Sequence, residues 1–323
     1  MNRSACVAFA LLVFAAFSAS AQNYPVRAIN LIVPFAAGGP SDALARVIAQ
    51  SMTTTLGQQV GIENVTGAGG TLAAAKGAQS RPDGYTMLLA HIGQSASVTL
   101  YRKLPYDPVG AFDPIGLIAE VPMVVVGRKD LPPKDIGELI GYIKVNKDKV
   151  TYGNGGVGSA SHFCGLLFMS AMQAEMTTVS YRGSAPAMLD VIGGRLDLLC
   201  DQTTTTTSQM RSGALKGYAV TMKSRVAAAP ELPTLNEAGL RDFDLSVWYG
   251  LLLPKGTPKA IADQLSAALK TALNDATVIK RLAEFGAQPV SQDRATPESF
   301  AAFFRADVAK WAPVIKAAGV YAD

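Results

Sequence analysis

The chain has 323 residues, of which 49% are hydrophobic and 17% charged, with 30 glycines and 18 prolines. This balance excludes a disordered or fibrous protein and leaves enough apolar sequence for one large domain or two ordinary ones. The net charge is +4 and no run of Lys or Arg could follow a phosphate backbone, so nucleic acid is not an expected partner. Two histidines and three cysteines offer few ligands for a structural zinc site, and we expect no metal and no cofactor.

Residues 1–21 have the three parts of a secretory signal peptide. A basic start precedes an apolar stretch from Ala5 to Phe17, which is followed by an Ala19-x-Ala21 end. About 13 apolar residues are too few to span a bilayer, which takes about 20, and no later segment offers a sufficiently long apolar run. We therefore expect cleavage after Ala21 and a soluble, secreted mature protein.

Strand-like and helix-like stretches alternate after this segment. The order of strands and helices predicts a largely parallel sheet with helices on both faces. In chain order, the first expected elements are strand Ile29–Val33, helix Asp42–Leu56, strand Val60–Val65, helix Thr71–Ala78, strand Thr86–Ala90, strand Val121–Val126 and helix Ile136–Asn146.

A second alternation follows and ends in a helical C-terminal part. Its expected elements are strand Val150–Tyr152, helix His162–Ala174, strand Thr177–Tyr181, helix Ala185–Gly193, strand Leu196–Leu199, helix Thr203–Arg211, strands Gly217–Thr221 and Val247–Leu253, helices Pro258–Leu273 and Thr277–Phe285, a short strand near Pro289-Val290, and helix Pro297–Ala317. Two such units predict two lobes: residues 22–123 with 247–323 form lobe 1, and residues 124–246 form lobe 2. The strands Val121–Val126 and Val247–Leu253 are the expected hinge.

Two glycine-containing loops follow strands, one in each unit. The first runs from Pro34 to Asp42 and the second from Tyr152 to His162. Ligands of open α/β sheets bind beyond the carboxyl ends of the strands, and free N–H groups at a helix start favour anions. The loops therefore predict a cleft for a ligand with one or more carboxylates, although an ordinary strand-to-helix connection also fits either loop alone.

The cysteines that remain after cleavage, Cys164 and Cys200, would lie in an oxidising compartment. There a pair more often crosslinks than stays free, and this loop length is worth about 3 kcal/mol in the chain-entropy picture. The alternative is two buried thiols that act as small hydrophobic side chains.

Enzymatic and nucleotide-binding motifs do not fit. The chain has no Gly-x-Ser-x-Gly, no Gly-Lys-Ser/Thr after a glycine loop, and Leu72 where a dinucleotide fingerprint needs its third glycine. His162 follows Ser159 by three residues at one helix start, which suits ligand contact, or else a solvent-facing or satisfied histidine.

Ten motifs in order along the chain resemble the periplasmic solute-binding proteins of tripartite tricarboxylate transporters, the Bug family. They are Tyr24-Pro25, Ile32-Val33-Pro34-Phe35-Ala36-Ala37-Gly38-Gly39-x-x-Asp42, Glu63-Asn64, Gly67-Ala68-Gly69-Gly70, Pro82-Asp83-Gly84-Tyr85-Thr86, Gly158-Ser159-x-Ser161-His162, Tyr181-Arg182-Gly183-Ser184-Ala185-Pro186-Ala187, Gly193-Gly194-Arg195-Leu196-Asp197, Leu232-Pro233-Thr234-Leu235-x-Glu237-Ala238-Gly239 and Trp248-Tyr249-Gly250-Leu251-Leu252-x-Pro254-x-Gly256-Thr257-Pro258. One departure is Cys200-Asp201-Gln202, where the family more usually has an apolar residue before Asp-Asn.

The resemblance implies a two-lobe, type II-like periplasmic-binding-protein fold that closes on a small carboxylate. Carried over to this chain, the implied ligand-binding residues are Phe35, Ala36, Gly38, Gly39, Ser41, Asp42, His91, Gln94, Ser159, Ser161, His162, Asp201 and Gln202. From its place at a strand end beside the second loop, Arg182 could pair with a distal carboxylate, or could be a surface arginine near Asp197 or Asp201.

The expected function is a non-catalytic, monomeric periplasmic receptor for a small organic acid. The acid would be a di- or tricarboxylate or an aromatic acid, and the partners would be the membrane subunits of a tripartite transporter. The alternatives are a ligand-sensing subunit for a signalling partner and a secreted enzyme that processes a carboxylate, for which no acid–base–nucleophile set is apparent.

Overall fold

The computed structural model describes residues 24–319, 321 and 322. The predicted signal peptide, residues 1–21, lies outside the described residues. Within them, no helix is both long enough and apolar enough to cross a membrane.

Strands and helices alternate through the first part of the chain as predicted. They are β1 (Ile29–Pro34), α2 (Pro40–Leu56), β2 (Val60–Val65), η1 (Ala68–Gly70), α3 (Thr71–Ala78), β3 (Thr86–His91), α4 (Ile92–Leu100), β4 (Phe112–Arg128), α5 (Ile136–Asn146) and η2 (Lys147–Lys149). Helix α4 and the first half of β4 are not among the predicted elements. In β4, Pro114 and Gly116 interrupt the strand pattern of the sequence, and the pairing with the neighbouring strand shifts its register between them.

The second part also follows the prediction, with element ends that differ by a few residues. Its elements are β5 (Thr151–Asn154), α6 (Ala160–Met172), β6 (Thr177–Ser180), α7 (Ser184–Ile192), β7 (Leu198–Gln202), α8 (Thr203–Arg211), β8 (Leu215–Val220), β9 (Ser246–Pro254), α9 (Lys259–Asn274), α10 (Ala276–Glu284), β10 (Gln288–Pro289) and α11 (Pro297–Ala318).

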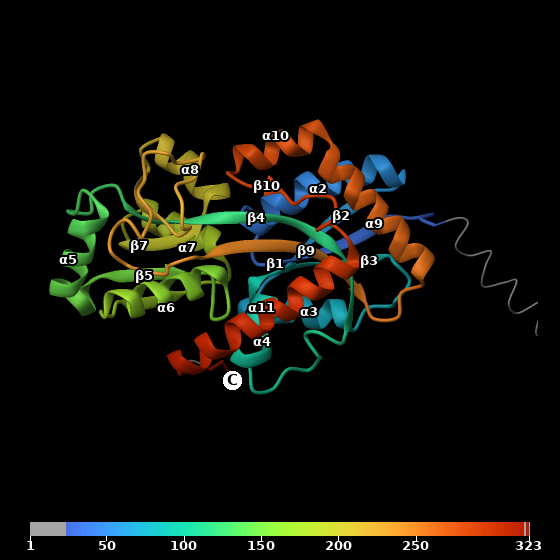
Figure 1. Cartoon of the computed structure of the whole chain (residues 1–323), viewed down its shortest axis with the longest axis horizontal. Helices are drawn as coiled ribbons and strands as arrows, with labels where there is room; N and C mark the ends of the chain where they lie inside the picture. Colours follow the sequence, from blue (N-terminus) through green and yellow to red (C-terminus); the bar gives the residue numbers. More distant parts are fainter. Residues whose placement is uncertain (1–23, 320, 323) are drawn as a thin grey trace, which may run out of the picture.

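The strands form one continuous sheet in the order β2-β1-β3-β9-β4-β7-β5-β6, with β8 and β10 also paired to β4. Strands β2, β1 and β3 are parallel, and so are β6, β5 and β7, whereas β9 runs antiparallel to β3 and to β4. Helices flank both ends of this sheet, and the long strand β4 extends from one end to the other (Figure 1). The expected α/β class with mainly parallel strands is confirmed.

Strand β4 joins the two lobes because it changes partners along its length. Up to Pro122 it pairs with β9, and from Met123 onward it pairs with β7 and β8. Strand β9 begins at Ser246, opposite Pro122. These points lie close to the predicted lobe boundaries at residues 123 and 247. Which residues move as one unit stays a prediction.

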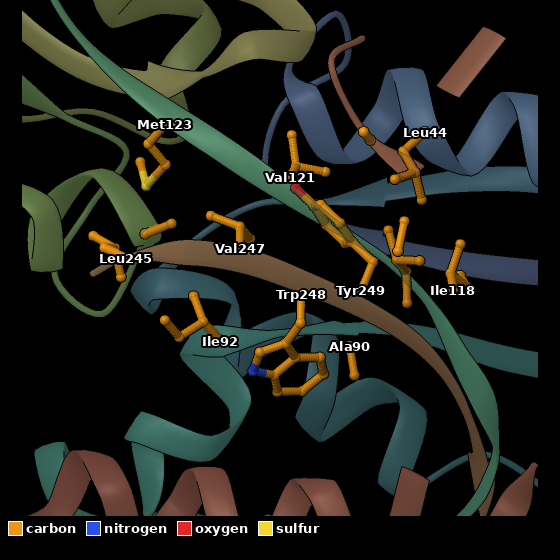
Figure 2. Close-up of a cluster of buried hydrophobic side chains, with 14 of the residues drawn as sticks. Leu44, Ala90, Ile92, Ile118, Val121, Met123, Leu245, Val247, Trp248 and Tyr249 are labelled. Atoms are coloured by element: carbon orange, nitrogen blue, oxygen red, sulfur yellow. The ribbon is translucent and has the colours of Figure 1, made fainter. Parts of the chain in front are cut away.

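Neighbouring side chains of β9 serve the core and the cleft separately. Trp248 and Tyr249 point to opposite sides of the strand, as consecutive strand residues do (Figure 2). The Trp248 ring lies 5.7 Å from the Phe300 ring of α11, and its Nε1 donates to the Asp307 carboxylate at 2.7 Å. Trp248 thus fixes the C-terminal helix to lobe 1 and leaves Tyr249 for the opposite face.

A disulfide joins Cys164 of α6 to Cys200 of β7, which confirms the predicted pairing. Both cysteines are fully buried within lobe 2. The double variant Cys164→Ala/Cys200→Ala should melt roughly 5–10 °C lower, because a crosslink over this separation stabilises by about 3–4 kcal/mol. Differential scanning calorimetry measures the shift. A melting temperature unchanged from that of the oxidised wild type would contradict the expected stabilisation.

Candidate ligand-binding site

Five helices begin at one cavity between the lobes. The residues at the starts of α2, α4, α6, α7 and α8 contribute to its wall, each just after a strand of the sheet. The cavity is lined by Phe35, Ala36, Gly39, Pro40, Ser41, His91, Gly155, Ser159, Ala160, Ser161, Ser184, Asp201, Gln202, Val247 and Tyr249. This is the edge at which open α/β sheets hold their ligands.

The starts of α2, α7 and α8 have no side-chain cap. Their N-cap residues are Gly39, Gly183 and Gln202. The two glycines have no side chain, and the Gln202 side chain accepts no hydrogen bond from the helix. By contrast, Ser159 caps α6 and His91 caps α4. Uncapped first-turn N–H groups carry the positive end of the helix dipole, so these three starts can bind an anion without any cationic side chain.

The lobes are in contact beside the cavity. A Cβ atom added to Gly69 would lie 2.0 Å from the Val157 carbonyl oxygen of lobe 2. One added to Gly183 of lobe 2 would lie 3.0 Å from the Ala36 nitrogen. The free volume of the cavity is about 30 Å³, room for about two ordered waters, so the cavity in this arrangement is too small to hold an organic acid.

The Tyr101 hydroxyl connects the two lobes. It donates to the Ala68 carbonyl of lobe 1 at 2.7 Å and lies 3.2 Å from the Val157 carbonyl of lobe 2. The hydroxyl has one hydrogen, so the contact with Val157 is the longer arm of a shared bond, and Tyr101→Phe should weaken ligand binding only about 2- to 4-fold, the low end of the value of a hydrogen bond. Calorimetric titration with any bound acid measures this change. Tyr24→Phe is the control, because the Tyr24 hydroxyl bonds to Gly84 within lobe 1. Equal affinities for wild type and Tyr101→Phe would contradict the expectation.

A hydrogen-bonded chain of three side chains crosses the cavity. Fully buried Tyr249 donates from its hydroxyl to Gln202 Oε1 at 2.9 Å, so the Ser41 hydroxyl, 3.1 Å away, must donate to the Tyr249 oxygen. Ser41 and Tyr249 belong to lobe 1 and Gln202 to lobe 2. The chain therefore orients the Gln202 amide at the cavity wall and uses its oxygen, so that the N–H₂ group is the donor of this side chain.

The ionisable side chains Asp201 and His91 line the cavity and have shifted pKa values. Asp201 is 3% exposed, and burial raises the pKa of its carboxyl to about 6. His91 Nδ1 accepts from the Gly93 N–H, which leaves the ring proton on Nε2, and burial lowers the His91 pKa to about 4. His91 is thus a neutral donor at pH 7. Among the described residues, no Lys or Arg lines the cavity.

Residues 44–320 match the family model described as tripartite tricarboxylate transporter family receptor. The chain is also 50% identical over 298 residues to a UPF0065 protein encoded in the TAR-I ttuE-ttuC' intergenic region of Agrobacterium vitis, which covers 92% of this chain and 86% of that protein. The chain belongs to the tripartite tricarboxylate transporter receptor family. The resemblance inferred from the sequence motifs is confirmed.

Solved structures of similar proteins agree with this family. The periplasmic binding protein BugD is 45% identical, with a TM-score of 0.90 over 92% of this chain and 99% of BugD. MatC from Rhodopseudomonas palustris, solved with bound malate, is 37% identical, with a TM-score of 0.87 over 90% of this chain and 100% of MatC. The two-lobe periplasmic-binding-protein fold expected from the sequence is therefore confirmed for this receptor-family chain.

Most of the residues expected to bind ligand line the cavity, and both glycine loops contribute to it. Those in the lining are Phe35, Ala36, Gly39, Ser41, His91, Ser159, Ser161, Asp201 and Gln202. Their contact with a ligand stays a prediction, as it does for the remaining expected residues.

Five expected residues lie outside the lining. Asp42 accepts from the Gly38 N–H at 3.0 Å and forms an ion pair with Arg46. Gln94 donates to the Pro108 carbonyl, and His162 Nδ1 accepts from the Gly158 N–H. Gly38 and Arg182 are exposed. In the structure, Asp42, Gln94 and His162 thus hold loop and helix ends in place around the site.

Two polar residues of the cavity are absent from the expected set, Ser184 and Tyr249. Both lie within motifs of the family resemblance, but nothing in the sequence shows that their side chains point into the cavity. Tyr249 reads as a core residue because its strand is almost continuously apolar. Ser184 lies just before the predicted helix Ala185–Gly193 and looks like an ordinary residue of a strand-to-helix turn. For the described part of the chain, no group of three or more His, Cys, Asp or Glu side chains could hold a metal ion.

The free energy of unfolding should fall as the pH is lowered from about 6.5 to about 4. Burial lowers the pKa of both His91 and His162 to about 4, below the ordinary 6.5, so the unfolded chain binds more protons in this window. Each histidine can contribute about 3 kcal/mol to the loss. The raised pKa of Asp201 acts in the opposite direction between about 4 and 6 and offsets only part of it. Urea titrations at several pH values measure the slope, and His162→Gln should reduce it. A stability independent of pH would contradict this.

Proposed function

We propose that this chain is a periplasmic solute-binding protein that captures a small organic carboxylate and delivers it to the membrane subunits of a tripartite tricarboxylate-type transporter. The observation that carries the proposal is the convergence of the uncapped starts of α2, α7 and α8 on one interlobe cavity. Backbone N–H groups at such starts favour a carboxylate. The malate bound to the related MatC has the same chemistry.

The hydrogen bonds around the cavity favour binding over catalysis. A serine nucleophile needs a histidine or another base within hydrogen-bond reach. Here His91 Nδ1 and His162 Nδ1 each accept a backbone N–H, and the Ser41 hydroxyl donates to Tyr249. The Ser184 hydroxyl does donate to a carboxyl, that of Asp201, but this carboxyl also accepts from Thr205 and from the Gln202 N–H, which makes it a weak base for a serine. These hydrogen bonds fix the orientation of the polar side chains around the cavity, as a receptor requires.

Delivery to a transporter and a periplasmic location are the finer parts of the proposal. They rest on the family to which the chain belongs and on the predicted cleavage after Ala21. Fractionation of the native cells tests the location. Uptake of the bound acid should be lost when the gene is deleted and restored when it is returned.

A thermal-shift screen of the mature protein against a panel of organic acids tests the binding itself. The panel should include short dicarboxylates, tricarboxylates and aromatic acids, and mass spectrometry should identify any acid that was purified with the protein. We expect at least one acid to raise the melting temperature and to be recovered chemically unchanged. A panel without any shift would contradict carboxylate capture, and conversion of the acid would indicate an enzyme.

A further inference from the structure

The cavity contains one buried acceptor among donors. Asp201 lies near the end of β7, 3% exposed, and its carboxylate contributes to the lining. The uncapped helix starts and the Gln202 amide offer hydrogen-bond donors, which suit the oxygens of a carboxylate ligand. The Asp201 carboxylate does not suit the oxygens of a carboxylate ligand, since it can only accept hydrogen bonds and it repels a second anion.

The groups packed around Asp201 only partly satisfy it. Three donors reach its carboxyl: the Gln202 backbone N–H, the Ser184 hydroxyl, and the Thr205 hydroxyl, which lies 2.9 Å from Oδ2. The titratable groups nearby are the Tyr152 and Tyr249 phenols, from β5 and β9, and the neutral His91 of the same cavity. No Lys or Arg accompanies them in the lining that the structure describes. An ionised carboxylate can accept about four hydrogen bonds, so acceptor capacity remains free in a site without a cation.

We propose that Asp201 makes the cavity select acids that carry a hydroxyl or ammonium group over plain carboxylic acids of the same length. This inference rests on the proposed function and adds the class of acid to it. A ligand hydroxyl or ammonium group donates to the free acceptor capacity of Asp201. A plain diacid leaves that capacity unpaired and brings a second anion beside it.

The expected discrimination is at least about 10-fold in dissociation constant. Leaving a buried charged acceptor without its partner costs about 1–3 kcal/mol, and 1.4 kcal/mol corresponds to a factor of ten. Sites built around a specific hydrogen bond reject analogues that lack the partner group even more strongly. A hydroxyl donor serves either protonation state of Asp201, whereas an ammonium group gains most when the carboxylate is ionised.

Matched acids that differ by one group provide the test. The sets are succinate, malate and aspartate; glutarate, 2-hydroxyglutarate and glutamate; and tricarballylate with citrate. Calorimetric titration at pH 7.5, above the Asp201 pKa of about 6, gives each dissociation constant for wild type and for Asp201→Asn. In wild type, the hydroxyl- or amino-bearing member should bind at least about 10-fold more tightly than its plain counterpart. Malate against aspartate shows which donor is preferred.

Asp201→Asn keeps the size of the side chain but exchanges one acceptor oxygen for an N–H₂ donor. We expect the ratio within a set to fall below about 3-fold, mainly because the plain acid binds better. Asp190→Asn is the matched control, since Asp190 lies on α7 outside the cavity lining and pairs with Arg195 and Tyr181. Its ratios should equal those of wild type.

The outcomes separate this inference from the function on which it rests. Equal binding of plain and donor-bearing acids by wild type, or an unchanged ratio in Asp201→Asn, overturns the role of Asp201 while carboxylate capture stands. If wild type binds other acids but none from the matched sets, this result also counts against the role of Asp201. If no acid of any kind binds wild type, the proposed function itself fails.

Discussion

Gly69→Ala should lower the affinity for the ligand by at least about 100-fold, equivalent to about 2.7 kcal/mol. Gly69 has a φ of +60° and rests against lobe 2, where an added Cβ would lie 2.0 Å from the Val157 carbonyl oxygen. Such an approach is impossible, and the obstacle is backbone that no rotamer change can remove. We therefore expect the alanine methyl group to hold the lobes apart at the point where they meet in this structure. Calorimetry with the acid that binds wild type measures the loss.

Gly57→Ala is the matched control for this substitution. Gly57 has a φ of +67° at the end of α2, and a Cβ atom there would meet nothing within 4 Å. Both variants share the cost of about 1 kcal/mol for an alanine in left-handed backbone, so both should melt slightly lower than wild type. Only Gly69→Ala should lose affinity, and only it should fail to become more compact with ligand in small-angle scattering. Binding by Gly69→Ala within about 3-fold of Gly57→Ala would show that closure at this contact does not matter.

Tyr249→Phe should weaken binding about 10- to 100-fold. The hydroxyl that it removes is the link between Ser41 and Gln202 and thus between the lobes, with 2.9 Å from Tyr249 to Gln202 Oε1. Its loss leaves two buried polar groups without their partner and frees the Gln202 amide to rotate away from the ligand. Each unpaired buried group costs about 1–3 kcal/mol in the closed state.

Tyr218→Phe separates this effect from a general loss of stability. Tyr218 is as buried as Tyr249, but its hydroxyl donates to the Pro133 carbonyl in lobe 2, away from the cavity. We expect both variants to lower the free energy of unfolding and only Tyr249→Phe to raise the dissociation constant. If the two variants bind the ligand equally well, the hydrogen bonds between Ser41, Tyr249 and Gln202 do not contribute to recognition.

Local patterns in the sequence are sufficient for most elements of the fold. Val60–Val65 and Thr71–Ala78 are correct to the residue, because a strand with β-branched Val and Ile and an alanine-rich helix carry clear local signals. Helix α4 is missed because glycine, serine and β-branched residues make up most of it, and these are weak helix formers. It is stabilised instead by the His91 side chain, which accepts from the Gly93 N–H, and by burial of Ile92 and Leu100. No local pattern shows either contribution.

The cavity is predictable where backbone defines it and less so where side chains do. Gly39 and Ser161 belong to the two glycine-containing loops. Such loops can be predicted from the sequence, because glycines at a helix start directly after a strand form a recognisable pattern. The direction of Tyr249 depends on the register of β9 against β3, where it pairs with His91, and on the approach of Gln202 from the other lobe. Asp42 shows the converse. Its carboxylate suits a ligand site by position, yet Gly38 and Arg46 already occupy it.

The most direct measurement compares an acid with its own uncharged ester at the same site. The acid that gives the largest thermal shift and its methyl ester should be titrated calorimetrically into the ligand-free mature protein. If uncapped helix starts recognise the anion, the acid should bind at a single site and the ester at least about 100-fold more weakly, because the charge that the N–H groups stabilise is gone. An ester that binds within about 3-fold of the acid would contradict carboxylate recognition at this cavity.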